Sequence, residues 1–172
     1  MSSLIRLADR AWGLPVLAAL ADGAAPRVPV LAARLGASRA AVADAVDHLV
    51  ALGVLSRRTG HSHPLRPDME VRDPEAASLA TRVLAATPEA FRPILRKKWS
   101  LPVLAALVDS GGFAALKKAL APVTARALSL ALQDLTEAGL VVRTLVDAPG
   151  RPGTRYALTP SGWMIADAAR GP

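Results

Sequence analysis

A nine-residue phrase occurs twice in this 172-residue chain, and it constrains the fold more than any other feature of the sequence. Trp12–Leu20 and Trp99–Leu107 differ only at their second position, which is Gly13 in the first and Ser100 in the second. Each phrase begins an apolar stretch with a proline at its fourth position, which is tolerated near a helix start or a kink. The chain is therefore predicted to contain the same kind of small domain twice.

The segment after the first phrase has the pattern of two helices and a strand. A helix is predicted over residues 28–35 and a second over 38–52, because their apolar residues fall on one helical face. Ser38 is expected to cap the second helix, and Gly53 to end it. The other expected elements of this copy are a helix over 3–21 with Pro15 near a helix start or kink, a strand over 53–58, and a polar loop or hairpin tip over 59–73.

The segment after the second phrase repeats this order more regularly. Ser100 is expected to cap the helix that carries Pro102. Pro122, Val123 and Thr124 are expected to form the turn before the helix over 124–138, which Gly139 ends. Leu128, Leu132 and Leu135 are expected to face inward. The other expected elements are a helix over 113–120, strands over 140–145 and 155–159, a Pro/Gly hairpin tip over 147–153, and a helix over 160–169.

Two short helices are predicted between the copies. Asp73 followed by proline is a helix-start pattern, so a helix is expected over 74–86 with Leu79, Val83 and Leu84 on one side. A further helix over 88–98, broken by Pro93, ends in the basic run Arg96–Lys98. The predicted organisation is a first, degenerate domain over 1–73, a helical linker over 74–98 and a second domain over 99–172.

Composition narrows the classes of function. The chain carries 21 Lys and Arg against 14 Asp and Glu, a formal net charge of +7, and residues 87–172 account for +5 of it (11 basic minus 6 acidic). This excess favours an anionic partner, with nucleic acid first. There is no cysteine, which excludes disulfides, thiolate metal sites and cysteine nucleophiles.

Helix, helix, turn, helix and hairpin is the order of a winged helix-turn-helix domain, so the expected fold is mainly α with small β-hairpin wings. The second copy also contains a set of motifs along these expected elements. They are Lys98-Trp99, the spacing of Phe113, Leu116 and Leu120, the apolar face of Leu128, Leu132 and Leu135, Glu137-Ala-Gly-Leu-Val141, Arg143, and Tyr156-x-Leu-Thr-x-x-Gly162. With these features, residues 98–162 resemble the HxlR-type winged helix-turn-helix transcriptional regulators. The first copy resembles them less closely, because it lacks a clear Tyr-x-Leu-Thr return strand, and its residues 31–38 are also similar to MarR-type helix-turn-helix segments.

The resemblance implies a DNA-binding transcriptional regulator whose partner is double-stranded DNA. Two tandem domains would form a pseudo-dimer and read two unequal half-sites about one helical turn apart. The start of each recognition helix would contact base edges or phosphates, and each wing and the preceding helix would contact phosphates. The residues implied in the second copy are Thr124, Ala125, Arg126, Ser129, Gln133, Lys117, Lys118, Arg151 and Arg155. Those implied in the first copy are Ser38, Arg39, Ala40, Ala41, Arg57 and Arg58.

Other features of the same helices favour weaker recognition of DNA. The family pattern has Gln and Arg where this chain has Leu130 and Ala131, and Leu130 is expected to point outward on the groove-facing surface. On the equivalent helix of the first copy, Asp44 and Asp47 would repel phosphate. A second interpretation therefore stays open: a winged-helix fold that binds or transforms an apolar small molecule, with weak or no DNA binding.

The pocket for that molecule is expected near Trp99 and Trp163. Trp12 and Trp99 also fit the role of core anchors, since each begins an apolar helix. A third interpretation is a protein-interaction adaptor that uses an apolar patch around Leu130. If the protein is a DNA-binding regulator, a small-molecule effector is a further possible partner.

The sequence offers no constellation of catalytic residues, so an enzyme is not the expected class, and no cofactor is expected. His61 and His63 lie close together without a third ligand nearby, so no metal site is expected. No apolar run approaches the roughly 20 residues of a membrane span. A cytoplasmic protein is therefore expected, either a monomeric pseudo-dimer or a homodimer.

Overall fold

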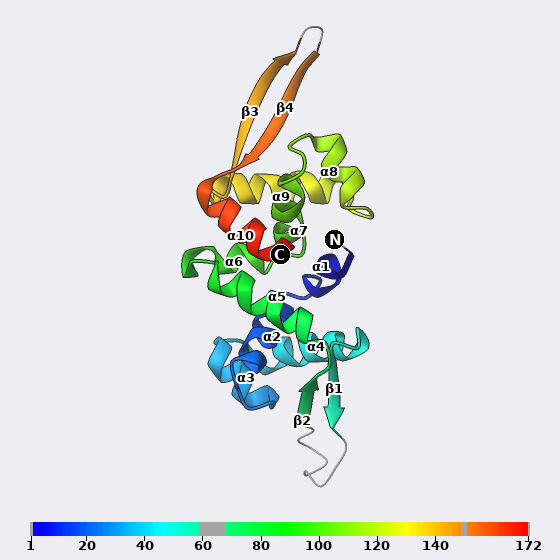
Figure 1. Ribbon diagram of the computed structural model, residues 1–172, viewed down its shortest axis with the longest axis vertical. Coiled ribbons are helices and arrows are strands. Elements are labelled where there is room, and N and C mark those ends of the chain that lie inside the picture. Colours follow the sequence, from blue (N-terminus) through cyan, green and yellow to red (C-terminus); the bar gives the residue numbers. More distant parts are fainter. Residues whose placement is uncertain (1, 59–67, 149–150, 172) are drawn as a thin grey trace.

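The computed structural model describes residues 2–58, 68–148 and 151–171, and it is mainly helical with two small antiparallel hairpins (Figure 1). The first half comprises α1 (Ser2–Leu7), α2 (Gly13–Ala21), α3 (Val28–Leu35), α4 (Arg39–Ala51), β1 (Leu55–Arg58), β2 (Asp68–Val71) and α5 (Pro74–Ala85). The second half comprises η1 (Glu89–Phe91), α6 (Arg92–Leu95), α7 (Ser100–Leu107), α8 (Phe113–Ala119), α9 (Ala125–Glu137), β3 (Val141–Ala148), β4 (Arg151–Leu158) and α10 (Pro160–Arg170).

From α2 to α5 and from α7 to α10, the elements follow one another in the same order. In each of these two stretches three helices precede a two-stranded antiparallel hairpin, and one helix follows it. The molecule is elongated, with the hairpins pointing toward opposite ends of the long axis and helices α5, α6 and α10 near the middle (Figure 1). The predicted mainly helical fold with hairpin wings is confirmed at this level.

The helix after each turn begins and ends as its sequence predicts. Ser38 Oγ accepts a hydrogen bond from Ala41 N at 3.2 Å at the start of α4, and Thr124 Oγ1 accepts one from Ala127 N at 3.1 Å at the start of α9. These bonds satisfy N–H groups that have no partner within the helix. After the two helices, Gly53 and Gly139 adopt φ values of 75° and 73°, the left-handed conformation that glycine tolerates best.

Four local predictions are wrong. The segment 59–73, expected to be a polar loop or hairpin tip, contains the strand β2, which pairs with β1. The helix expected over 3–21 is divided into α1 and α2, and the chain turns back so tightly that a Cβ at Gly13 would lie 2.7 Å from Leu7 O. Ser100 does not cap α7: the helix begins one residue earlier than expected, with Trp99 at the cap position, and the buried Ser100 Oγ has no hydrogen-bond partner. The hairpin tip expected over 147–153 is shorter, because most of these residues extend the paired strands β3 and β4.

Buried side chains form one apolar core that runs through both halves. Helix α2 packs against α5, α7 packs against α10, and α5 also contacts α10, so the last helix of each half joins the two. On α5 the buried face consists of Ala76, Ala77, Ala80 and Val83, whereas Leu79 and Leu84 are only partly buried. The alanines allow close approach of the helices, and the predicted Leu-rich face of this segment is rotated accordingly.

Candidate nucleic-acid interface and adjoining cavity

Helix α9 presents its N-terminal turns to solvent. Leu128, Leu132 and Leu135 are buried as predicted, which fixes the opposite face of the helix outward. Thr124, Ala125, Arg126, Ser129 and Gln133 are exposed on that face. Gln133 Nε2 donates a hydrogen bond to Glu137 Oε1 at 2.8 Å, so this amide is held along the helix. Arg126 is the only exposed cation on the described α9 helix.

Further basic residues lie on the elements around α9. Lys117 and Lys118 are exposed on α8, and Arg143 and Arg155 are exposed on the β3–β4 hairpin. The side chain of Arg151 lies outside the described residues. These cations come from three different elements, which gives the second half a positively charged, solvent-facing surface.

The base of the β3–β4 hairpin is held against the turn between α7 and α8. Tyr156 N donates a hydrogen bond to Gly111 O at 2.9 Å, and a Cβ at Gly111 would lie only 2.2 Å from Tyr156 O. Only glycine allows this approach of the two backbones. The contact fixes the direction in which the hairpin leaves the body, and with it the position of Arg155.

On the corresponding helix of the first half, both aspartates are paired with arginines. Ser38, Arg39 and Ala40 are exposed at the start of α4, and Ala41 is partly buried. Asp44 Oδ2 forms an ion pair with Arg10 Nε at 2.9 Å, and Asp47 forms one with Arg57. Arg57 of β1 is therefore held by Asp47 of α4, and the side chain of Arg58 lies outside the described residues.

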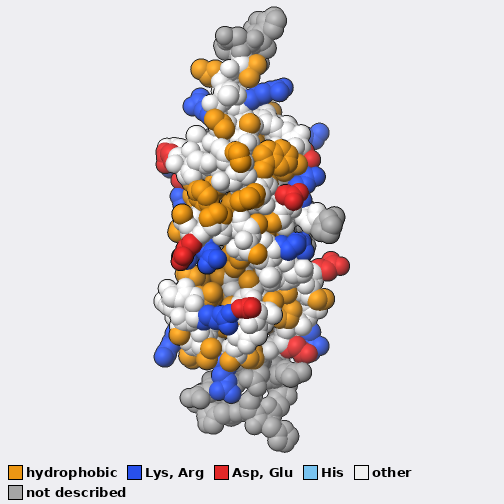
Figure 2. Space-filling view, turned by 60° about the vertical axis from the view of Figure 1, so that its left-hand side comes forward, with side chains coloured by type: hydrophobic (Ala, Val, Ile, Leu, Met, Phe, Trp, Pro, Cys, Tyr) orange, Lys and Arg blue, Asp and Glu red, His pale blue; other side chains and the backbone are white. Residues whose placement is uncertain are grey.

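Exposed apolar side chains concentrate in the second half. Leu145 is 79% exposed on the hairpin, Leu130 is 52% exposed on α9 as predicted, and Trp163 is 48% exposed on α10. Val142, Val146 and Met164 are also exposed. Figure 2 shows apolar side chains on the surface of this half, below the tip of the hairpin, and also along the rest of the same face. The surface around the basic residues is therefore partly apolar.

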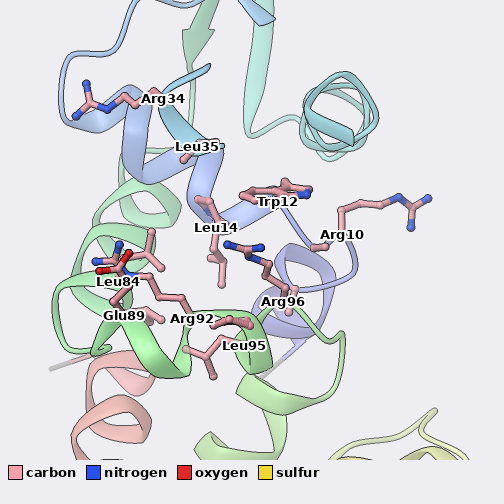
Figure 3. Close-up of a pocket in the computed structure, with 15 residues that line it drawn as sticks. Arg10, Trp12, Leu14, Arg34, Leu35, Leu84, Glu89, Arg92, Leu95 and Arg96 are labelled. Atoms are coloured by element: carbon pink, nitrogen blue, oxygen red, sulfur yellow. The ribbon is translucent and has the colours of Figure 1, made fainter. Parts of the chain in front are cut away.

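A cavity of about 330 Å³ lies between the first half and the η1–α6 connection. Its apolar lining includes Trp12, which directly precedes α2, Leu14 of α2, Leu84 of α5 and Leu95 of α6 (Figure 3). Trp99 and Trp163, near which a pocket was predicted, do not line it. Trp99 is partly buried against the core, and the Lys98 ammonium lies 5.5 Å from the centre of its ring.

Sequence reasoning missed the role of Trp12 in this cavity. The Arg96 guanidinium lies over the Trp12 ring, 4.0 Å from its centre. The two residues are 84 positions apart in the chain, so no local pattern connects them. The repeat of the Trp12 phrase and the basic run Arg96–Lys98 were both visible in the sequence. The contact between Trp12 and Arg96 was not.

The next two residues of the basic run contact other elements. Lys97 Nζ lies 2.7 Å from Asp134 Oδ2 on α9, and Lys98 is paired with Asp9 in the connection between α1 and α2. The Lys98 ammonium, hydrogen-bonded to the Asp9 carboxylate, holds the pKa of that carboxyl below its ordinary value, although partial burial acts in the opposite direction. Asp9 also forms an ion pair with Arg10 at 2.6 Å.

Within the described residues, no group of three His, Asp or Glu side chains could hold a metal ion. His61 and His63 lie outside that part of the chain. None of the helices described is both long enough and apolar enough to cross a membrane.

The arrangement of α7, α8, α9, the β3–β4 hairpin and α10 is consistent with a winged helix-turn-helix domain. Residues 94–169 match the family model described as HxlR-like helix-turn-helix, in agreement with the resemblance found in this part of the sequence. The match does not extend over the first half, so the tandem repeat stays a prediction. No curated protein and no solved structure matched the chain.

Proposed function

We propose that the protein is a DNA-binding transcriptional regulator with two winged-helix modules in one chain. The observation that carries the proposal is the match of residues 94–169 to the HxlR-like helix-turn-helix family, on a segment whose α9 begins with an exposed polar turn. Such a turn, with a hairpin beside it, suits insertion into the major groove of DNA.

Each exposed group has a part in this proposal. Arg126 is the residue suited to read a base edge, because a guanidinium can donate two hydrogen bonds to guanine. Lys117, Lys118 and Arg155 supply phosphate contacts that hold the protein on DNA without reading sequence. Arg151, Thr124, Ala125, Ser129 and Gln133 complete the proposed contact set.

Two observations support a further winged-helix module in the first half of the chain. The order of elements from α2 to α5 repeats that from α7 to α10, and the Trp12 phrase repeats the Trp99 phrase. In this proposal one chain takes the place of a dimer, with Ser38, Arg39, Arg57 and Arg58 as the first module's contact residues. Light scattering on the protein alone and with DNA would distinguish a monomeric pseudo-dimer from a homodimer.

The test is a fluorescence anisotropy titration with DNA from upstream of the protein's own gene. We expect affinity to fall steeply as salt rises, because phosphate contacts release counterions. Arg126→Ala should relax the preference between sequences, at about 1–3 kcal/mol for the base it reads, whereas Lys117→Ala should weaken binding to all sequences alike. Absence of binding even at low salt would refute the proposal.

The cavity beside Trp12 favours the second interpretation, a winged-helix fold that binds a small molecule. Its volume lies at the lower end of the range of about 300–1,000 Å³ for ligand sites. Ligand binding without DNA binding in the same protein preparation would support that interpretation over the first.

A further inference from the structure

We infer that the cavity beside Trp12 is a binding site for a small aromatic carboxylate, and that its occupancy is coupled to both α4 and α9. The biological role of this coupling rests on the proposed function, since α4 and α9 are the helices proposed to contact DNA. The ligand site itself stands independently of DNA binding.

The lining of the cavity has two chemically different parts. Its inner surface is apolar, with Trp12, Leu14, Leu84 and Leu95 directed toward the space (Figure 3). Its remaining lining carries four arginines, Arg10, Arg34, Arg92 and Arg96, against one carboxylate, Glu89. An apolar surface beside an excess of cations fits a flat apolar ligand with one negative charge.

Two of the four arginines already have acidic partners. Arg10 is paired with Asp9 and Asp44, and Arg34 with Asp22. In Figure 3 the guanidinium groups of both arginines point away from the centre of the cavity. They are therefore not the first groups to receive a ligand's charge.

The other two, Arg92 and Arg96, make no ion pair with any described residue. Arg96 is partly buried and lies over the Trp12 ring at 4.0 Å, so its guanidinium is held within the cavity lining. A guanidinium presents paired donors that match a carboxylate. An aromatic carboxylate matches both the apolar and the cationic part of the lining. Its ring would lie against Trp12 and the leucines, and its carboxylate would bind Arg96 and Arg92.

Contacts of the lining residues lead from this site to both helices. Arg96 is followed directly by Lys97, whose ammonium holds Asp134 on α9 at 2.7 Å. Arg10 reaches Asp44 on α4 at 2.9 Å. A carboxylate that draws Arg96 from the Trp12 ring shifts the adjacent Lys97, which contacts α9. The same change at the Trp12 ring shifts the nearby Arg10, two residues earlier in the chain, which contacts α4.

The first experiment uses 2-naphthoate as the probe and neutral 2-naphthamide as its matched control, with calorimetry and tryptophan fluorescence. We expect one naphthoate per chain, bound at least about tenfold more tightly than the amide, since a charged hydrogen bond contributes that much or more. Trp12→Phe should remove most of the fluorescence change, and Trp163→Phe should leave it intact. Absence of binding, equal affinity for the amide, or a response that follows Trp163 would overturn the site.

The second experiment compares two arginine variants. Arg96→Gln should weaken naphthoate binding by about tenfold or more. Arg170→Gln is the matched control, because Arg170 is paired with Asp109 and does not line the cavity. Equal affinities of the two folded variants would show that Arg96 does not receive the carboxylate. Circular dichroism of both variants would verify that they are folded.

The coupling is tested first without DNA, by hydrogen exchange with and without saturating 2-naphthoate. We expect altered protection of amides in both α4 and α9, and a smaller change in α9 for Asp134→Asn, which removes the charge that Lys97 holds. Unchanged exchange in both helices while naphthoate binds would overturn the coupling. In DNA titrations naphthoate should shift the affinity about fivefold or more. Naphthoate binding with no DNA binding at all would refute the proposed function and leave the ligand site standing.

Discussion

Thr124 stands at the start of the proposed recognition helix with two functions. Its hydroxyl accepts the Ala127 N–H, and its exposed position places it among the groups proposed to face DNA. Ser38 has the same cap position at the start of α4. Because a cap satisfies a backbone donor that would otherwise lack a partner, loss of the hydroxyl affects the helix itself as well as any contact with DNA.

Thr124→Ala is therefore expected to lower the free energy of unfolding by about 1 kcal/mol. Thr124→Ser, which keeps an oxygen able to accept the same bond, should retain most of the stability. Urea denaturation followed by circular dichroism measures both. If the alanine and serine variants were equally stable, the cap would contribute nothing in solution.

Asp9 gives a pH-dependent prediction. Its folded pKa is lowered chiefly by the hydrogen bond from Lys98, so the stabilisation is present above the unfolded value of about 3.9 and is lost as pH falls through the folded pKa. Lys98→Gln should raise the Asp9 pKa toward its ordinary value, measured by NMR titration of the carboxyl carbon. The stability difference between the two proteins should be present at pH 7 and shrink below about pH 4. An unchanged Asp9 titration in the variant would contradict the assignment.

At the scale of elements, α9 shows how one helix serves packing and surface together. Leu128 is fully buried and Leu130, two residues on, is half exposed. Leu128→Ala is expected to cost about 2–5 kcal/mol, because it removes buried methyl groups and leaves a cavity. Leu130→Gln should change stability by no more than about 0.5 kcal/mol. Thermal and urea unfolding of the two variants would reveal the contrast, and a large loss with Leu130→Gln would mean that this side chain is covered in solution.

The elements that local patterns specify were predictable from the sequence. Ser38 and Thr124 begin helices because their hydroxyls bond within four residues, and Gly53 ends one because a left-handed residue is required there. Ser100 was misjudged because the backbone of Trp99 already has a helical conformation, which places the serine inside the first turn. The Leu79 and Leu84 face was misjudged because α2 and α10 select the alanine side of α5.

What the sequence could not predict lies in contacts between distant segments. The run Arg96–Lys98 was visible, but its partners distant in sequence lie in two other parts of the fold: Asp9 and Trp12 in the α1–α2 connection, and Asp134 on α9. A pocket near Trp99 and Trp163 stays a prediction, and nothing in the sequence indicated the cavity beside Trp12, whose lining includes residues of α2, α5, η1 and α6. Of the proposed DNA contacts, the sequence predicted which residues are exposed on α9, but not that Asp47 holds Arg57.

For the whole molecule, the continuous core predicts one cooperative unfolding transition. Buried residues of both halves belong to a single cluster, and α5 joins the halves by packing against α2 and α10. Leu17→Ala in the first half and Leu132→Ala in the second should therefore each shift the same transition, as judged by coincident tryptophan fluorescence and circular dichroism curves. Two separated transitions, each sensitive to only one of the variants, would show that the halves unfold independently.

The ion pairs on α4 have a consequence for how such a protein would lie on a DNA duplex. Arg10 and Arg57 cancel the charges of Asp44 and Asp47, whereas α8 and the β3–β4 hairpin keep their cations exposed. A homodimer has two identical ends and cannot distinguish the left side of a palindrome from the right. The two ends of this chain differ in how their charges are paired, and a regulator with two unlike ends binds an asymmetric site in a single orientation, so that it can mark a direction along the DNA.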